Sequence, residues 1–103
     1  MTIDIRSAAI ATTPAMLEYV ARRIQSALGR LGANVRGVVV RLGDANGPRG
    51  GIDKTCRVLA RMRTGPVVID EVDRDLYVAI DRAADRLSRA AVRAIDRRRV
   101  QGA

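Results

Sequence analysis

The feature that most constrains this sequence is a stretch near its end in which apolar residues recur every three or four positions. That spacing places them on one side of an α-helix, and this side must be buried against other parts of the chain. Asp73 or Asp75 can cap the first free amides of such a helix. We predict a helix over about residues 75–98 and a flexible tail at 99–103. The apolar stripe consists of Tyr77, Ile80, Ala84, Leu87, Ala91 and Ile95.

A second helical pattern begins after Thr12-Thr13-Pro14. Thr13 can cap the helix, and Pro14 loses no hydrogen bond at the first helical position. Gly32 suits the left-handed conformation that ends many helices. We predict this helix over about residues 14–31. Its apolar side carries Leu17, Val20, Ile24, Leu28 and Leu31.

The remaining segments have the pattern of strands. Ile3 and Ile5 alternate with polar residues, and residues 35–42 are rich in β-branched side chains. Residues 54–63 alternate between an apolar side, which includes Cys56, and a side with three arginines; a fourth strand begins at Pro66. Residues 43–51 hold four glycines but no Gly-Lys-Ser/Thr, so they indicate a hairpin connection and not a phosphate-binding loop.

The order strand–helix–strand–strand–strand–helix predicts an α+β fold. Two helices with one apolar side each fit a two-layer arrangement, in which both pack on one face of a four-stranded, mostly antiparallel sheet. The other face of the sheet would remain open to solvent. A chain of 103 residues suffices for one domain, so we assign residues 1–103 to a single domain.

The composition argues against several classes of function. The chain has no His and a single Cys, so we expect no zinc or other metal site, no internal disulfide, no cofactor and no catalytic residues. Four acidic residues between 70 and 75 offer carboxylates to an enzyme, but acids before a helix usually cap it. No apolar run reaches the ~20 residues of a membrane span, and the first six residues resemble no signal peptide. We expect a cytoplasmic protein with no membrane partner and no small-molecule substrate.

The charge of the chain indicates an acidic partner. Eighteen Arg and one Lys (Lys54) face 11 acidic residues, which gives a net charge of +8 and a pI near 11.3. Residues 82–99 alone hold seven arginines and two aspartates. At ~100° per residue, five arginines fall within an arc of about 80° opposite the apolar stripe, along roughly 22 Å of helix. These five are Arg82, Arg86, Arg89, Arg93 and Arg97.

The first helix adds a smaller basic group opposite its apolar side: Arg22, Arg23 and Arg30. A planar guanidinium engages phosphate oxygens in pairs, so these eight arginines are the candidate RNA-binding residues. Tyr19 and Tyr77 are the only aromatic residues; we expect Tyr77 in the core, with its hydroxyl at the edge, and Tyr19 at the surface. With so few aromatic side chains, binding should depend on the RNA backbone and shape more than on base sequence.

The segment DLYVAIDRAADRL (residues 75–87) closely resembles the second-helix motif of ribosome hibernation-promoting factors. That family includes the ribosome-associated inhibitor proteins, also called sigma-factor modulation proteins. The Thr13-Pro14-Ala15 and Val20-Ala21-Arg22-Arg23 segments are also similar to the family, and the resemblance covers roughly residues 2–98.

The resemblance implies a non-enzymatic protein with the fold of a double-stranded-RNA-binding domain. Such proteins bind the small ribosomal subunit between head and body, where tRNA and mRNA would lie, and keep idle ribosomes inactive in stationary phase or stress. The family's rRNA-facing positions correspond to Arg86 and Arg89 most clearly, with Arg82 and Arg93 on the same side. Arg22 and Arg23 correspond to basic positions of the first helix.

Two departures from the family pattern concern the sheet: Cys56-Arg57 stands where Val-Glu is frequent, and Val72 where a polar residue is expected. The chain resembles the short form or an isolated N-terminal domain, which implies a monomer away from the ribosome. Two alternatives remain open from the residues alone. One is a general structured-RNA-binding module, and the other is a regulatory domain that docks on an acidic protein.

Overall fold

The computed structural model describes residues 1–8, 10–45 and 53–102, with side chains of the last helix as far as Arg97. Its elements follow the predicted order: β1 (Thr2–Ser7), α1 (Pro14–Leu28), the 3-10 helix η1 (Gly29–Asn34), β2 (Val35–Asp44), β3 (Lys54–Met62), β4 (Gly65–Asp73) and α2 (Leu76–Gly102). The predicted glycine-rich loop lies largely outside the described residues, and its first two positions extend β2.

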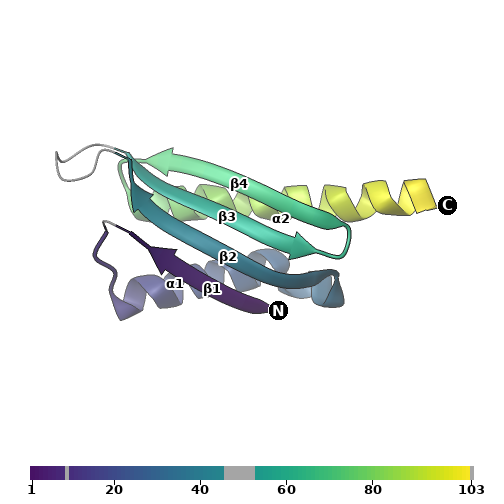
Figure 1. The fold of residues 1–103 in the computed structure, drawn as a ribbon, viewed down its shortest axis with the longest axis horizontal. Coiled ribbons are helices and arrows are strands. Elements are labelled where there is room, and N and C mark those ends of the chain that lie inside the picture. The colour runs from purple at the N-terminus through teal and green to yellow at the C-terminus, as the bar shows by residue number, and fades with distance from the viewer. Residues whose placement is uncertain (9, 46–52, 103) are drawn as a thin grey trace.

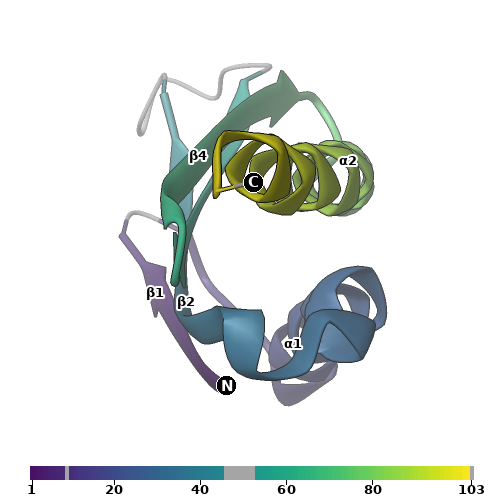
Figure 2. The same cartoon turned by 90° about the vertical axis from the view of Figure 1, so that its right-hand side faces the viewer.

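The four strands form one sheet in the order β1-β2-β3-β4. β1 pairs with β2 in parallel, because α1 carries the chain back across the sheet between them; the other two pairs are antiparallel. Both helices cover the same face of the sheet, and the opposite face has no covering layer among the described residues (Figures 1 and 2). The predicted α+β class and two-layer arrangement are confirmed.

The core lies between the sheet and the helices. Alternate residues of β3 point into it, and Cys56, Val58, Ala60 and Met62 are all buried, as the strand pattern predicted. From α2, Ala79, Ala83 and Ala91 are fully buried beside Leu87. Small side chains at these positions let the helix axis approach the sheet closely, so the long helix packs over much of its length.

The start of α1 is as predicted, but its end differs. Thr13 Oγ1 accepts a hydrogen bond from the amide of Met16 at 3.1 Å, with Pro14 at the first helical position. The α-helix then ends at Leu28, not near residue 31, and the next turn is the 3-10 helix η1. Gly32 has a positive φ of 55°, which glycine adopts readily, but its ψ of −128° is not the left-handed helical conformation predicted for it, and it lies inside η1 and not directly after the α-helix.

α2 begins at the two capping residues predicted for it. Asp75 Oδ1 accepts from the Tyr77 amide at 2.9 Å, and Asp73 Oδ2 accepts from the Asp75 amide at 2.9 Å. The predicted end is wrong, because the helix continues through Gly102. Residues 99–102 are therefore the last helical turn instead of a tail, and Ala103 lies outside the described residues.

The expected places of the two tyrosines are reversed. Tyr77 is 37% exposed, while Tyr19 is partly buried and packs against the core. The rings meet edge to face with their centroids 5.0 Å apart. The Tyr19 hydroxyl reaches α2, where it donates a hydrogen bond to Asp81, so both tyrosines belong to the contact between the helices. No helix in the described part of the chain is long and apolar enough to cross a membrane.

Candidate nucleic-acid interface

α2 carries the five predicted arginines on its solvent side, and all five are exposed. The two nearest its N-terminus are held by the neighbouring strand β4. Arg82 Nη1 lies 3.3 Å from Asp73 Oδ1. Arg86 Nη1 lies 2.9 Å from both Glu71 Oε1 and the carbonyl oxygen of Asp70. Arg82 and Arg86 therefore join α2 to β4 as well as facing solvent.

The other three arginines of α2 are unconstrained. Arg89, Arg93 and Arg97 are exposed and have no hydrogen bond or ion pair with any described residue. They span about 12 Å of helix at ~1.5 Å per residue. The C-terminal end of α2 extends past the turn between β3 and β4 (Figure 1). Asp96 is the acidic residue nearest to them in the helix, and it pairs with none of them.

The three basic residues predicted on the first helix differ in accessibility. Arg22 is exposed, and its guanidinium lies 3.9 Å from Glu18, a loose contact between two mostly exposed side chains. Arg30 lies in η1 and not in the α-helix, where it is exposed and has no partner among the described residues. Both guanidiniums are therefore available to an external anion.

Arg23, by contrast, lies between the helices. Its guanidinium donates to Asp81 Oδ1 at 3.0 Å, to the Asp81 carbonyl at 3.2 Å and to Asp85 Oδ1 at 3.1 Å, and its side chain is only 28% exposed. Burial lowers the pKa of Arg23, but the bonds to Asp85 and Asp81 outweigh it, so the pKa is raised overall. The pKa of Tyr19 is also raised, chiefly by its hydrogen bond to Asp81. This cluster fastens α1 to α2.

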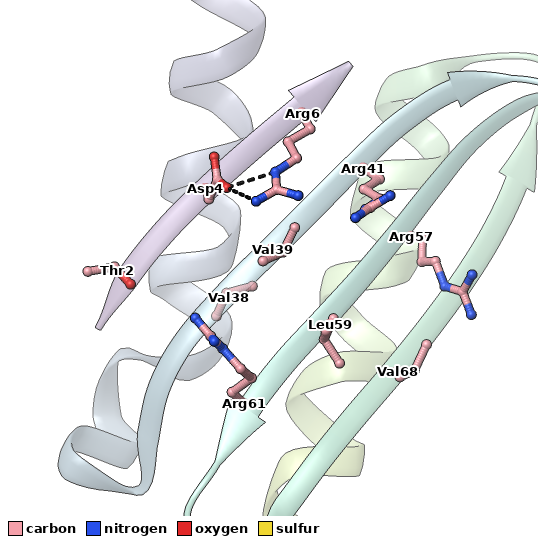
Figure 3. Close-up of a pocket in the computed structure, with 10 residues that line it drawn as sticks. All are labelled: Thr2, Asp4, Arg6, Val38, Val39, Arg41, Arg57, Leu59, Arg61 and Val68. Atoms are coloured by element: carbon pink, nitrogen blue, oxygen red, sulfur yellow. Dashed lines mark hydrogen bonds and ion pairs between the residues drawn. The ribbon is translucent and has the colours of Figure 1, made fainter. Parts of the chain in front are cut away.

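The open face of the sheet holds a further basic group that the sequence analysis did not assign to a site. Arg6, Arg41, Arg57 and Arg61 project from three adjacent strands around a hollow of about 580 Å³ (Figure 3). Strand alternation already placed Arg57 and Arg61 away from the core. Arg41 lies beside Arg57 because β2 pairs with β3, and Arg6 lies beside Arg41 because β1 pairs with β2.

The other candidate chemical groups have structural roles in the described part of the chain. Glu71 and Asp73 pair with arginines of α2, and Asp75 caps that helix. Cys56 is 1% exposed; burial, aided by the charges of Glu71 and Asp70, raises the pKa of its thiol to about 12. The described residues contain no cluster of acidic or Cys side chains arranged to bind a metal ion. The groups that remain available to a ligand are the exposed arginine side chains of the helices and of the open face of the sheet.

Comparison with known proteins places these features in a family. The sequence profile of the "Sigma 54 modulation protein / S30EA ribosomal protein" family matches residues 3–99. The N-terminal domain of Thermus thermophilus Protein Y is similar to this chain at 26% identity and a TM-score of 0.76, over 90% of this chain and 98% of that one.

A ribosomal subunit interface protein from Coxiella burnetii shares the fold at 11% identity and a TM-score of 0.76, over 90% of this chain and 96% of that one. A comparison of the sequence with curated proteins found no significant match. The family profile covers nearly the whole chain, including all of α1, β2, β3 and β4 and most of β1 and α2. The protein therefore belongs to the sigma 54 modulation protein / S30EA ribosomal protein family.

Proposed function

We propose that this protein is a translation inhibitor that binds small-subunit rRNA in the channel used by tRNA and mRNA. Bound there, it would keep idle ribosomes inactive under stress or in stationary phase. Membership of a family of ribosome-associated, non-enzymatic proteins supports this proposal. The observation that carries the finer proposal is the set of arginines on α2 that no described residue neutralises: Arg89, Arg93 and Arg97.

Three like charges on one helix side repel one another and lower the stability of the helix slightly. Neutral polar residues would avoid this cost, so the arrangement favours a role in binding. RNA supplies a matching row of phosphates, and each guanidinium can engage two oxygens of one phosphate. Arg22 and Arg30 add positive charge from the first helical segment. Such contacts fix the position of the protein but read little base sequence.

Inhibition requires only occupancy. A folded domain in the channel excludes tRNA and mRNA sterically, and its own residues need to perform no reaction. Arg82 and Arg86 are already tied to β4 and face the same solvent side, so they would present rigid, partly neutralised charges to the RNA. We expect them to contribute less binding free energy than the three unconstrained arginines. We propose that the protein acts in the cytoplasm and is monomeric when it is not bound to a ribosome.

Sedimentation with purified ribosomes and small subunits over a salt series tests the proposal. Five unconstrained or loosely held arginines predict a log–log slope of affinity against salt near −4, at about −0.7 to −0.9 per phosphate contact. In a translation assay, the protein should inhibit initiation and should compete with mRNA and tRNA for the small subunit.

The variant Arg89→Glu/Arg93→Glu should leave the ribosome fractions at a salt concentration where the native protein stays bound. Its matched control is Arg63→Glu/Arg74→Glu, which makes the same change in net charge at two exposed positions outside both helices. Equal loss by both variants would reduce the effect to net charge. Equal affinity of the native protein for free duplex RNA and for ribosomes would instead support a general RNA-binding module.

A further inference from the structure

The open face of the sheet is organised in rows that cross the strands. One row places Arg6 of β1, Arg41 of β2 and Arg57 of β3 directly opposite one another, and it ends at Asp70 of β4. The adjacent row begins with Asp4 of β1 and is apolar across the other three strands, where Val39, Leu59 and Val68 lie in register. A fourth arginine, Arg61, lies beyond the apolar row, so arginines flank an apolar floor on both sides (Figure 3).

The row of three opposed arginines destabilises the sheet when no ligand is bound. Neighbouring strands lie about 4.8 Å apart, and like charges directly opposite each other are destabilising. Asp4 offsets Arg6 at 2.9 Å, and Asp70 offsets Arg57 at 3.3 Å, but all four of these side chains are more than half exposed. Arg41 in the centre has no partner among the described residues, and neither has Arg61. The face therefore keeps a net positive charge that only an external anion can neutralise.

We propose that this open face is a second RNA-binding surface, specific for single-stranded RNA. The phosphates would lie over the row of Arg6, Arg41 and Arg57. The unpaired bases would lie on the apolar floor and against Arg61. Guanidinium planes stack on exposed bases as well as binding phosphate, which suits arginines beside an apolar strip.

Two features favour an unpaired strand. A duplex hides the faces of its bases, so it would leave the apolar floor exposed, and Val68 is 46% exposed in the free protein. The second feature is the position of Arg61. Gly37 lies in register with it, and a Cβ on this glycine would stand 3.4 Å from Arg61 Nη2 and 3.0 Å from Thr2 Oγ1. The absence of a side chain at Gly37 therefore lets the Arg61 guanidinium lie close over β2, beside the apolar floor.

An acidic peptide fits this face less well. An extended peptide gains its affinity from main-chain hydrogen bonds at a sheet edge. Here the backbone groups of β2 and β3 are already used within the sheet, so the face offers side chains only. RNA needs no backbone partner, because its phosphates take their hydrogen bonds from guanidinium groups.

The surface lies on the side of the sheet away from both helices (Figure 2). The arginines of α2 and those of the sheet can therefore contact different RNA segments at the same time. The inference does not depend on the ribosome as target, since it rests only on the sheet.

The test measures fluorescence anisotropy of a labelled ten-nucleotide oligouridine and of a ten-base-pair RNA duplex. To remove the contribution of α2, all proteins carry Arg89→Gln/Arg93→Gln. Into this background we introduce either Arg41→Gln/Arg61→Gln or the matched control Arg63→Gln/Arg74→Gln, which removes the same charge at exposed positions outside the hollow. Circular dichroism verifies that each variant is folded.

We expect the sheet variant to lose single-strand affinity at least fivefold relative to the control. Its salt slope should become shallower by about 0.7, since Arg41 is the one phosphate contact that it removes and each single-strand phosphate contact contributes about 0.7. Equal affinities of the sheet variant and the control would overturn the inference, as would preference for the duplex. Tighter binding of an acidic peptide such as (Glu-Leu)5, lost in the sheet variant, would assign the face to a protein partner. Ribosome sedimentation of the native chain tests the proposed function separately, so either proposal can fail alone.

Discussion

Replacement of Arg23 by alanine distinguishes a structural arginine from an RNA-binding one. The sequence places Arg23 among the candidate RNA contacts, whereas the structure places it between α1 and α2, bonded to Asp81 and Asp85. Arg22→Ala is the matched comparison, because it removes the same charge from the adjacent residue. The two variants should behave oppositely in a stability assay and in a ribosome-binding assay.

The expected loss of stability follows from the three hydrogen bonds of Arg23. The pair with Asp81, which is 44% exposed, contributes about 1 kcal/mol, and the pair with Asp85, which is 64% exposed, about 0.5 kcal/mol. The bond to the Asp81 carbonyl adds about 0.5 kcal/mol. The free energy of unfolding should therefore fall by about 2 kcal/mol. In a domain of this size that lowers Tm by about 10 °C.

Arg22→Ala should lower the unfolding free energy by at most about 0.5 kcal/mol, because the pair with Glu18 is long and exposed. Thermal melts followed by circular dichroism measure both values, and urea titration checks them. Ribosome sedimentation at 20 °C, where both variants are folded, should show weaker binding for Arg22→Ala and near-native binding for Arg23→Ala. If Arg23→Ala has the same Tm as Arg22→Ala but binds the ribosome more weakly, Arg23 is an RNA contact and the structural argument fails.

Two further predictions concern α2 and the core. Arg86→Glu should destabilise the protein by about 1–2 kcal/mol, because it places a carboxylate beside Glu71 and removes the hydrogen bond to the Asp70 carbonyl. Arg89→Glu should change the stability by less than about 0.5 kcal/mol. Equal midpoints of the two variants in urea titrations would contradict this prediction. The thiol of Cys56 has a pKa of about 12 in the folded state, whereas the unfolded thiol ionises near pH 9. The contribution of the protonated thiol to the stability of the fold is therefore complete below pH 9 and is lost as the pH rises toward 12. Between pH 9 and 11 the native protein should lose about 2–3 kcal/mol more than Cys56→Val, at about 1.4 kcal/mol per pH unit; parallel stability curves of the two proteins would refute it.

The elements and their order could be predicted because they depend on local patterns. The apolar spacing in α2, the Thr13-Pro14 start of α1 and the alternation in β3 are each visible within about ten residues of sequence. The ends were less accurate. α1 changes to a 3-10 turn after Leu28, while Leu31 remains partly buried against the core and so preserves the apolar period beyond the α-helix. Periodicity alone does not separate these two helix types.

The tyrosines show where local reasoning fails. Tyr77 has the spacing of a core residue, but it occupies the first turn of α2, at the edge of the helical layer. Tyr19 is the more buried ring because α1 presents it to α2, where Asp81 accepts its hydroxyl proton in a hydrogen bond. The choice between them depends on how the two helices pack, and that contact joins residues about 60 positions apart.

The sequence by itself determined the α+β class, most of the buried side of each helix and the surplus of arginine, whereas Leu17 and Tyr77, both predicted for those sides, are exposed. Only the tertiary structure decided which arginines are accessible. Arg23 pairs with aspartates 58 and 62 residues away, and Arg86 pairs with a glutamate 15 residues away. Arg89, Arg93 and Arg97 pair with no acidic side chain among the described residues. The row of Arg6, Arg41 and Arg57 exists only because of strand register. The physical reason is that hydrophobic period is a property of neighbours in the chain, whereas charge pairing depends on distances that packing and register set.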